Sequence, residues 1–161
     1  MSIEIIKIDY SNRQHAADLS FLMNAYASDS MAGGKPLSDY VIKNLAFELS
    51  KLDHAFSLIT YVNDKPAGLV NCFEAFSTFN CKPLVNIHDF FVLQAYRQAG
   101  LSQLMLEKVT DIARTKNCCK LTLEVLAGNN AARSAYQKYG FTAYELDKAT
   151  GVALFWHKDI T

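Results

Sequence analysis

The chain has 161 residues, of which 50% are hydrophobic and 20% charged, as in a single globular domain over residues 1–161. Sixteen Lys and Arg residues balance sixteen Asp and Glu residues, so the composition excludes a generic polyanion-binding surface. We therefore expect no nucleic-acid partner. The four cysteines lack paired CxxC spacing, so we expect no metal site. No apolar run has membrane-spanning length, so we expect no membrane partner and a cytoplasmic location.

Hydrophobic periodicity in the first half of the chain predicts two helices between β-rich runs. The pattern indicates a strand at 3–8, a helix at 12–27 and, after a glycine-rich loop, a second helix from Ser38 to 52. Two β-rich runs follow within 54–77, and the turn Asn63-Asp64-Lys65-Pro66 between them predicts a hairpin.

In the second half, strands and helices alternate. The predicted elements are a strand at 84–93, a helix at 100–116, a strand at 119–126, a helix at 129–139 closed by Gly140, and a strand at 151–160. The residues of the 100–116 helix that we expect to face inward are Leu101, Leu104, Met105, Val109 and Ile112. This element order predicts an α/β (α+β) domain.

One junction in this half, "YRQAGLS", joins a strand to a helix through small residues. A glycine-containing turn there presents unpaired N–H groups at the positive end of a helix dipole, an arrangement that suits phosphate, and Arg97 adds charge. Other phosphate and nucleophile motifs fit worse, because the chain contains no GxxxxGK[ST], GxGxxG or GxSxG sequence.

The stretches "DFFVLQAYRQAGLSQLML" and "LTLEVLAGNNAARSAYQKYGF" resemble the GCN5-related N-acetyltransferases (GNAT), and the order of elements extends the resemblance over nearly the whole chain. "HDFFV…YR" is similar to the diamine acetyltransferase branch, and other spans to uncharacterised bacterial members. The resemblance implies a GNAT fold: a mixed central β-sheet, helices on both faces, and two splayed parallel strands that hold coenzyme A.

The same resemblance implies a site for acetyl-CoA as co-substrate. The family's [RQ]xxGx[GA] loop aligns with residues 97–102, whose amides would hold the pyrophosphate, while the pantetheine arm would lie between strands ending near Val92 and Val125. Gln98 and Ser102 occupy places that are commonly glycine. Because backbone amides would do the binding, Gln98 is tolerable there if its φ stays negative, and Ser102 adds little bulk. The cofactor-binding residues implied in this way are Phe91, Val92, Leu93, Arg97, Gln98, Ala99, Gly100, Leu101, Ser102, Asn129, Ala132 and Tyr136.

Two residues are candidates for catalysis. From its spacing alone Tyr136 is a core aromatic residue, but the resemblance places it at the CoA sulfur, where a phenol can protonate the departing thiolate. His88 stands where the diamine branch usually has a glutamate base, and an imidazole can deprotonate an ammonium directly or through water. The alternative for His88 is a half-buried histidine with satisfied hydrogen bonds.

Four acidic residues are candidates for binding the acceptor: Asp29, Glu74, Asp89 and Glu124. Asp89 is suited to orienting His88, to attracting a cationic amine or to bonding a loop, while Glu124 either lines the same cleft or is a solvated strand residue.

We therefore expect an acetyl-CoA-dependent N-acetyltransferase that acts on a small primary amine, such as a diamine or an amino acid, by direct attack without an acyl-enzyme. The alternatives are a non-catalytic module that binds CoA or acyl-CoA, and a protein N-acetyltransferase. Exposed terminal strands would allow a homodimer.

Overall fold

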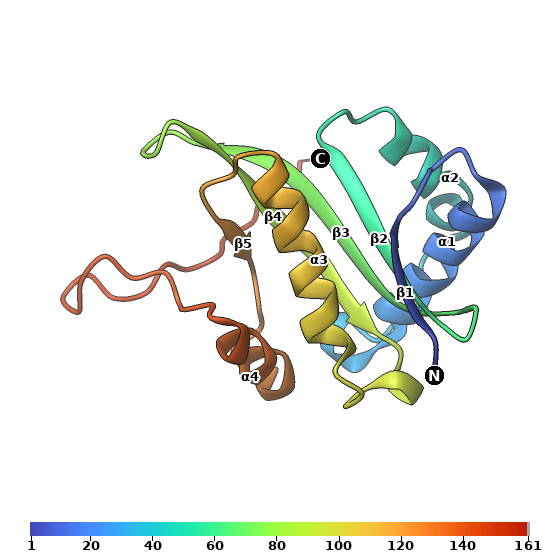
Figure 1. The fold of residues 1–161 in the computed structure, drawn as a ribbon. Coiled ribbons are helices and arrows are strands. Elements are labelled where there is room, and N and C mark those ends of the chain that lie inside the picture. The colour runs from blue at the N-terminus through green and yellow to red at the C-terminus, as the bar shows by residue number, and fades with distance from the viewer. Residues whose placement is uncertain (161) are drawn as a thin grey trace. The chain divides into compact units, whose positions relative to one another are not determined.

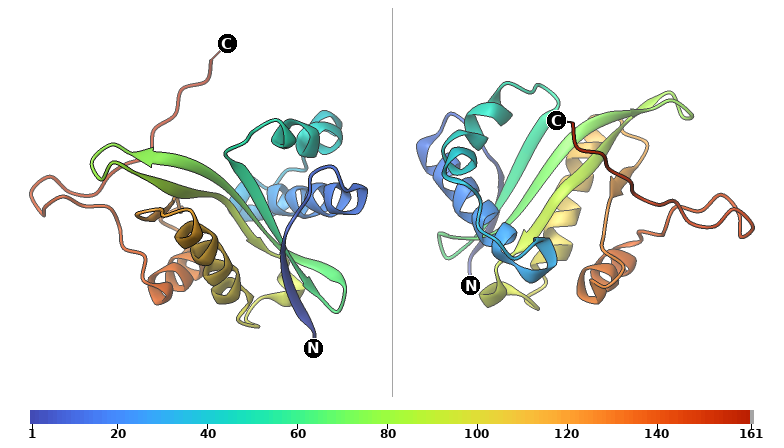
Figure 2. Two further views of the ribbon diagram at one scale, coloured as in Figure 1. Left: turned by 45° about the horizontal axis from the view of Figure 1, so that its top comes forward. Right: turned by 180° about the vertical axis from the view of Figure 1, so that it is seen from behind.

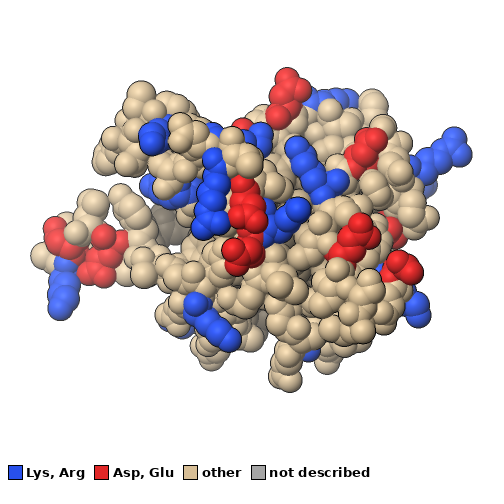
Figure 3. Space-filling view, viewed as in Figure 1, with Lys and Arg blue, Asp and Glu red and all other residues tan. Residues whose placement is uncertain are grey.

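The computed structural model describes residues 1–160 (Figure 1). The chain forms two compact units, residues 1–123 and the residues from Glu124 onward. No helix among the described residues is long and apolar enough to cross a membrane. Figure 3 shows acidic and basic side chains interspersed on one face, in agreement with the balanced composition.

A five-stranded mixed sheet forms the centre of the first unit, and its spatial order is the chain order. The strands are β1 (Ile3–Lys7), β2 (Ala55–Val62), β3 (Lys65–Ser77), β4 (Lys82–Val92) and β5 (Leu121–Leu123). The first four pair antiparallel, and β5 pairs parallel to β4. The predicted hairpin between β2 and β3 is confirmed, because Asn63 and Asp64 both have positive φ (47° and 62°), as a two-residue primed turn requires.

Helices cover both faces of this sheet, as predicted (Figure 2). The helices α1 (Arg13–Ser28) and α2 (Asp39–Ser50) lie on one face, and α3 (Leu101–Thr115) lies on the other. The predicted Ser38 cap of α2 is confirmed, because its hydroxyl accepts a hydrogen bond from the N–H of Val41 at 3.3 Å. Two 3₁₀ turns, η1 (Ser30–Ala32) and η2 (Gln94–Tyr96), follow α1 and β4.

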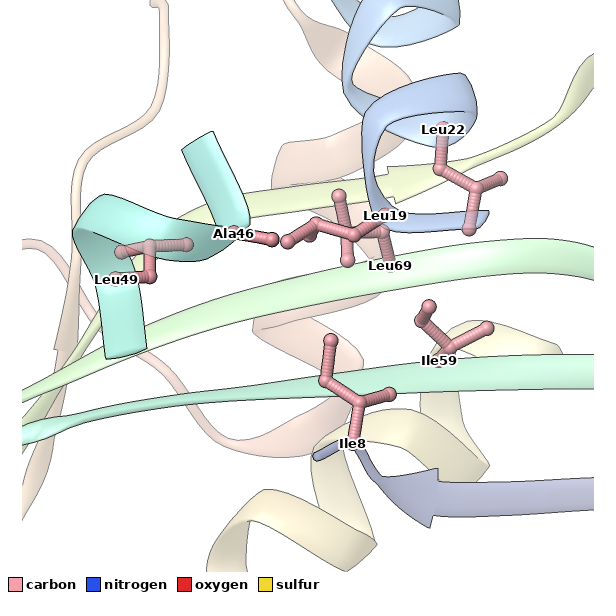
Figure 4. Close-up of a cluster of buried hydrophobic side chains, with 7 residues drawn as sticks. All are labelled: Ile8, Leu19, Leu22, Ala46, Leu49, Ile59 and Leu69. Atoms are coloured by element: carbon pink, nitrogen blue, oxygen red, sulfur yellow. The ribbon is translucent and has the colours of Figure 1, made fainter. Parts of the chain in front are cut away.

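Each face of the sheet has its own apolar layer. The layer beneath α1 and α2 consists of Ile8, Leu19, Leu22, Ala46, Leu49, Ile59 and Leu69 (Figure 4). On the other face, the fully buried side chains that α3 contributes are Leu101, Met105, Leu106 and Val109. Gly68 of β3 permits this packing, because a Cβ there would lie 3.0 Å from the Met105 sulfur.

The prediction that Leu104 faces inward was wrong, since 46% of its surface is exposed. The buried stripe of α3 follows four-residue steps from Leu101 through Met105 and Val109, and Leu104 lies at its margin.

The second unit contains α4 (Asn130–Tyr139), which Asn129 caps at its start and Gly140 (φ 111°) closes, as predicted. The strands predicted before and after α4 are longer than the structure shows. The run 119–126 forms a strand only over Leu121–Leu123, and 151–160 is not a strand. Alternating apolar residues are not sufficient, because a strand needs a hydrogen-bonded neighbour, and within 124–160 the structure shows only one bridge, from Glu145 to Val152.

Candidate active site

The strand β4 is paired on both sides along only part of its length. The parallel ladder with β5 runs from Val85–Leu121 to Ile87–Leu123 and then stops. Beyond it, residues 89–92 pair with β3 alone within residues 1–123. Within residues 1–123, no strand therefore lies along one edge of β4 beyond Ile87.

A β-bulge marks the same point on the other side of β4. Asn71 of β3 is opposite Asp89, but the next residue, Cys72, is opposite Ile87, so His88 is one extra residue in β4. The side chain of His88 is exposed, and its ring meets Phe73 edge-on with centroids 5.3 Å apart. His88 is thus more open to solvent than the half-buried alternative required.

The loop between β4 and α3 carries a run of free amides. Within residues 1–123 the N–H groups of Gln98, Gly100 and Ser102, and of the residues between them, have no hydrogen-bond acceptor. Gly100 caps α3 at φ 77°, and a Cβ there would have open space around it. An anionic group fits this place, because the amides are unpaired and the helix begins there.

The condition of a negative φ at Gln98 is not met, because its φ is 63°. The loop needs a left-handed residue at this position, a conformation that favours glycine.

Arg97 connects this loop to the end of α1. Its Nη2 lies 2.7 Å from Oδ2 of Asp29, its Nε donates to the carbonyl of Val92 at 3.0 Å, and its guanidinium lies 5.7 Å from the centre of the Phe91 ring. The other Asp29 oxygen accepts from the N–H of Met31. Hydrogen bonds from Arg97 and Met31 hold the pKa of Asp29 below its usual range. A predicted CoA residue and a predicted acceptor residue are thus joined in one ion pair.

Asp89 lies on the α1 face of the sheet. Its Oδ2 accepts a hydrogen bond from Nδ2 of Asn71 at 2.9 Å. Nearby, burial together with the charges of Asp89 and Asp29 raises the pKa of Tyr26, whose ring lies 5.3 Å from that of Phe91. Two of the four acidic candidates, Asp29 and Asp89, therefore act on the same phenol.

The other two acidic candidates lie apart from this pair. Glu74 contacts Lys116, at the end of α3, with 2.6 Å between Oε1 and Nζ, and strand alternation places it on the α3 face. Glu124 is the exposed first residue of the second unit. Their roles at an acceptor site stay predictions.

In the second unit, Oδ1 of Asn129 accepts a hydrogen bond from the N–H of Ala132 at 3.2 Å and so begins α4. Tyr136 is the buried residue of this helix, with its ring edge-on to Phe141 at 5.9 Å. Among residues 1–160, no three His, Cys, Asp or Glu side chains are placed to hold a metal ion.

Sequence reasoning missed the polar residues behind Asp89. Ser57 and Asn71 are buried at 1% and 3% exposure, and Tyr10 hydrogen-bonds to Ser57. The available signal was a lone asparagine in the apolar run "AGLVNCF", since a buried amide needs partners.

Comparison with known proteins agrees with this geometry. A profile of the acetyltransferase (GNAT) family matches residues 19–141. A thialysine N-epsilon-acetyltransferase of Caenorhabditis elegans is 28% identical over 102 residues, which are 63% of this chain and 61% of the relative. One of Bos taurus is 33% identical over 73 residues, 45% of this chain and 39% of the relative. The matched regions thus span less than two thirds of these relatives.

Solved structures share the fold over almost the whole chain. The aminoglycoside acetyltransferase AAC(6')-Iy, in complex with a CoA bisubstrate analogue, superposes with a TM-score of 0.74 at 19% identity, covering 99% of this chain and all of that one. A possible acetyltransferase of Clostridium difficile gives 0.78 at 18% identity over all of both chains. The family profile covers more than half of the sequence, and the chain belongs to the acetyltransferase (GNAT) family.

Proposed function

We propose that this chain is an acetyl-CoA-dependent N-acetyltransferase that transfers an acetyl group to a primary amine of a small molecule. The observation that carries the proposal is the adjacency of the one-sided half of β4 and the free amides of residues 98–102. The named relatives, which acetylate amines, support the same reaction class. The family match covers residues of both units.

In this proposal the amides of Gln98 to Ser102 bind the pyrophosphate of acetyl-CoA, and Arg97 adds positive charge. Along the open edge of β4, backbone groups of Phe91 and Val92 that are not bonded to β3 pair with the pantetheine amides. Leu93, whose N–H donates to the carbonyl of Ala67, borders this stretch. The family resemblance also assigns to acetyl-CoA the helix cap Asn129 and, on α4, Ala132 and Tyr136.

The reaction needs a neutral amine. His88 removes a proton from the ammonium, directly or through water, and the nitrogen attacks the thioester carbonyl. A backbone N–H of residues 91–93 stabilises the oxyanion. As the C–N bond forms and the C–S bond breaks, the nitrogen loses its second proton to water. Tyr136 gives its proton to the sulfur of CoA and regains one from solvent.

For the acceptor we propose an amine that is cationic in solution. Asp89 supplies negative charge on the α1 face beside the bulge. Further candidates are Asp29, which is paired with Arg97, Glu74 and Glu124. Thialysine, the substrate named for the curated relatives, is the first acceptor to test.

The test is a panel of primary amines incubated with acetyl-CoA and the protein, with release of the CoA thiol as the signal. We expect thiol release to depend on both the protein and an amine. Binding of acetyl-CoA without turnover of any amine would instead identify a non-catalytic CoA-binding module, and absence of CoA binding would refute the proposal altogether.

A further inference from the structure

A row of buried polar side chains crosses three strands and ends at Asp89. Ser57 of β2, Asn71 of β3 and Asp89 of β4 are register partners, so their side chains lie on the same face of the sheet. Tyr10, in the turn before α1, extends the row by one member.

The hydrogen bonds of this row run in one direction. The hydroxyl of Ser57 donates to Oδ1 of Asn71 at 2.6 Å, and Nδ2 of Asn71 donates to Oδ2 of Asp89 at 2.9 Å. Because the Ser57 proton is used in this way, Tyr10 must be the donor in its 2.8 Å contact with the Ser57 oxygen. Burial raises the pKa of Tyr10, which keeps the phenol protonated for that role.

The asparagine amide is also fixed in its orientation. Its Nδ2 contacts the sulfur of Met23 at 3.2 Å as well as the carboxylate, and both partners are acceptors. A flipped amide would point its oxygen at the Asp89 carboxylate. The orientation of the amide thus follows from its partners, and each hydrogen bond of the row has its donor on the side away from Asp89 and its acceptor on the side toward it.

Folding alone does not require a polar row here. The row two residues further along the same face is Ile59, Leu69 and Phe91, which is apolar. Apolar residues of similar shape are often at least as stabilising as a buried polar network. We therefore attribute the polar row to its hydrogen bond with Asp89. Asp89 pairs with Asn71 at the ladder position next to the bulge at His88.

We infer that Asn71, supported by Ser57 and Tyr10, is a positioning residue that fixes the Asp89 carboxylate to receive the positive charge of an alkylammonium acceptor. Within residues 1–123 the second carboxylate oxygen, Oδ1, has no hydrogen-bond donor, which leaves it for the ligand. The inference rests on the proposed acetyltransferase function and adds the residues that set its acceptor preference.

The test uses the full chain with acetyl-CoA and thialysine. Asn71→Leu keeps the branched shape of the side chain, although leucine is larger, and removes the hydrogen bond to Asp89. A hydrogen bond to a charged group is strong, so we expect the KM for thialysine to rise about tenfold or more, with the KM for acetyl-CoA unchanged. Tyr10→Phe removes only the outermost donor and should raise the same KM about two- to threefold.

Two further variants separate positioning from damage to the fold. Asn86→Leu makes the same exchange on β4 and breaks the 3.1 Å bond to Thr122, so it should lower the melting temperature and leave the thialysine KM as it is. In an Asp89→Asn background, Asn71→Leu should have no further effect on that KM, because its action passes through the carboxylate.

An effect of Asn71→Leu that is equally large with and without the Asp89→Asn exchange would overturn the inference, and so would a change confined to the melting temperature. If Asn71→Leu does not fold, Tyr10→Phe decides by the same two readouts. Failure of the proposed function looks different, since the unaltered protein would then release no thiol with any amine. If the protein acetylates other amines but not thialysine, this would also count against binding of an alkylammonium by Asp89.

Discussion

The two halves of β4 differ although they belong to one continuous strand. Residues 85–87 have a neighbour on each side, and their apolar side chains, such as Val85 and Ile87, are buried. Residues 89–92 pair on one side only within residues 1–123, and the bulge with its exposed histidine, His88, precedes them. The first half stabilises the sheet, and the second half is where we propose that the co-substrate binds.

The largest expected effect tests whether the chemistry also depends on a residue outside β4. Tyr136→Phe keeps the ring and removes the proton that the proposal assigns to the CoA thiolate. We expect kcat to fall by roughly 10²- to 10⁴-fold with little change in the KM for acetyl-CoA. Steady-state kinetics measure this, with Tyr139→Phe on the same helix as the matched control. Full activity of Tyr136→Phe would make the tyrosine a core residue only.

Ile87 and His88 are neighbours at the boundary between the two halves of β4, so substitutions at these residues compare the halves directly. Ile87 is 2% exposed, so Ile87→Ala should lower the free energy of unfolding by about 2–5 kcal/mol while the surviving folded protein keeps its pH profile. His88→Ala should cost little stability, because the side chain is exposed, and should remove the acidic limb of kcat/KM.

The control for His88 is His54, whose ring also lies beside Phe73, at 6.0 Å. His54→Ala should leave the acidic limb in place. Protonation of the free amine can imitate such a limb, so acceptors of different basicity are needed. A limb that follows the acceptor and survives His88→Ala would assign His88 to structure.

A pair of glycines tests the loop that follows the open half. Gly100 and Gly151 both have φ of 77° and open space around a Cβ, so valine meets the same backbone strain at each. Gly100→Val should weaken CoA binding by about tenfold or more, because the strain moves the free amides of the loop. Isothermal titration calorimetry measures this. Equal affinities of the Gly100→Val and Gly151→Val variants would move the CoA site elsewhere.

The smallest expected effect concerns Gln98. Its φ of 63° is costly for a residue with a Cβ, so Gln98→Gly should raise the free energy of unfolding by about 0.5–1 kcal/mol after the entropic cost of glycine is subtracted. Ala99→Gly, in the same loop at a residue without positive φ, should instead destabilise by a similar amount. Chemical denaturation distinguishes the two signs.

Sequence reasoning predicted turns and helix ends well wherever local signals were strong. The Asn63-Asp64 turn, the Ser38 cap and the Gly140 helix end each have a local cause, and the structure has all three. It overestimated the strand at 151–160, because alternation does not say whether a partner strand is available.

The site was only partly predictable. The loop at Gly100 was visible as a run of small residues, but the positive φ of Gln98 was not, because glutamine rarely adopts it. The pairing of Arg97 with Asp29 and of Asn71 with Asp89 joins residues far apart in the chain, and no local pattern encodes such contacts.

The most direct measurement is amide hydrogen exchange with and without acetyl-CoA. The account predicts new protection in residues 89–92 and 98–102 and no change in residues 85–87, whose amides already lie in a paired ladder. Protection that appears instead between α1 and α2, or that spreads evenly along β4, would contradict the claim that the one-sided half of this strand and its loop hold the co-substrate.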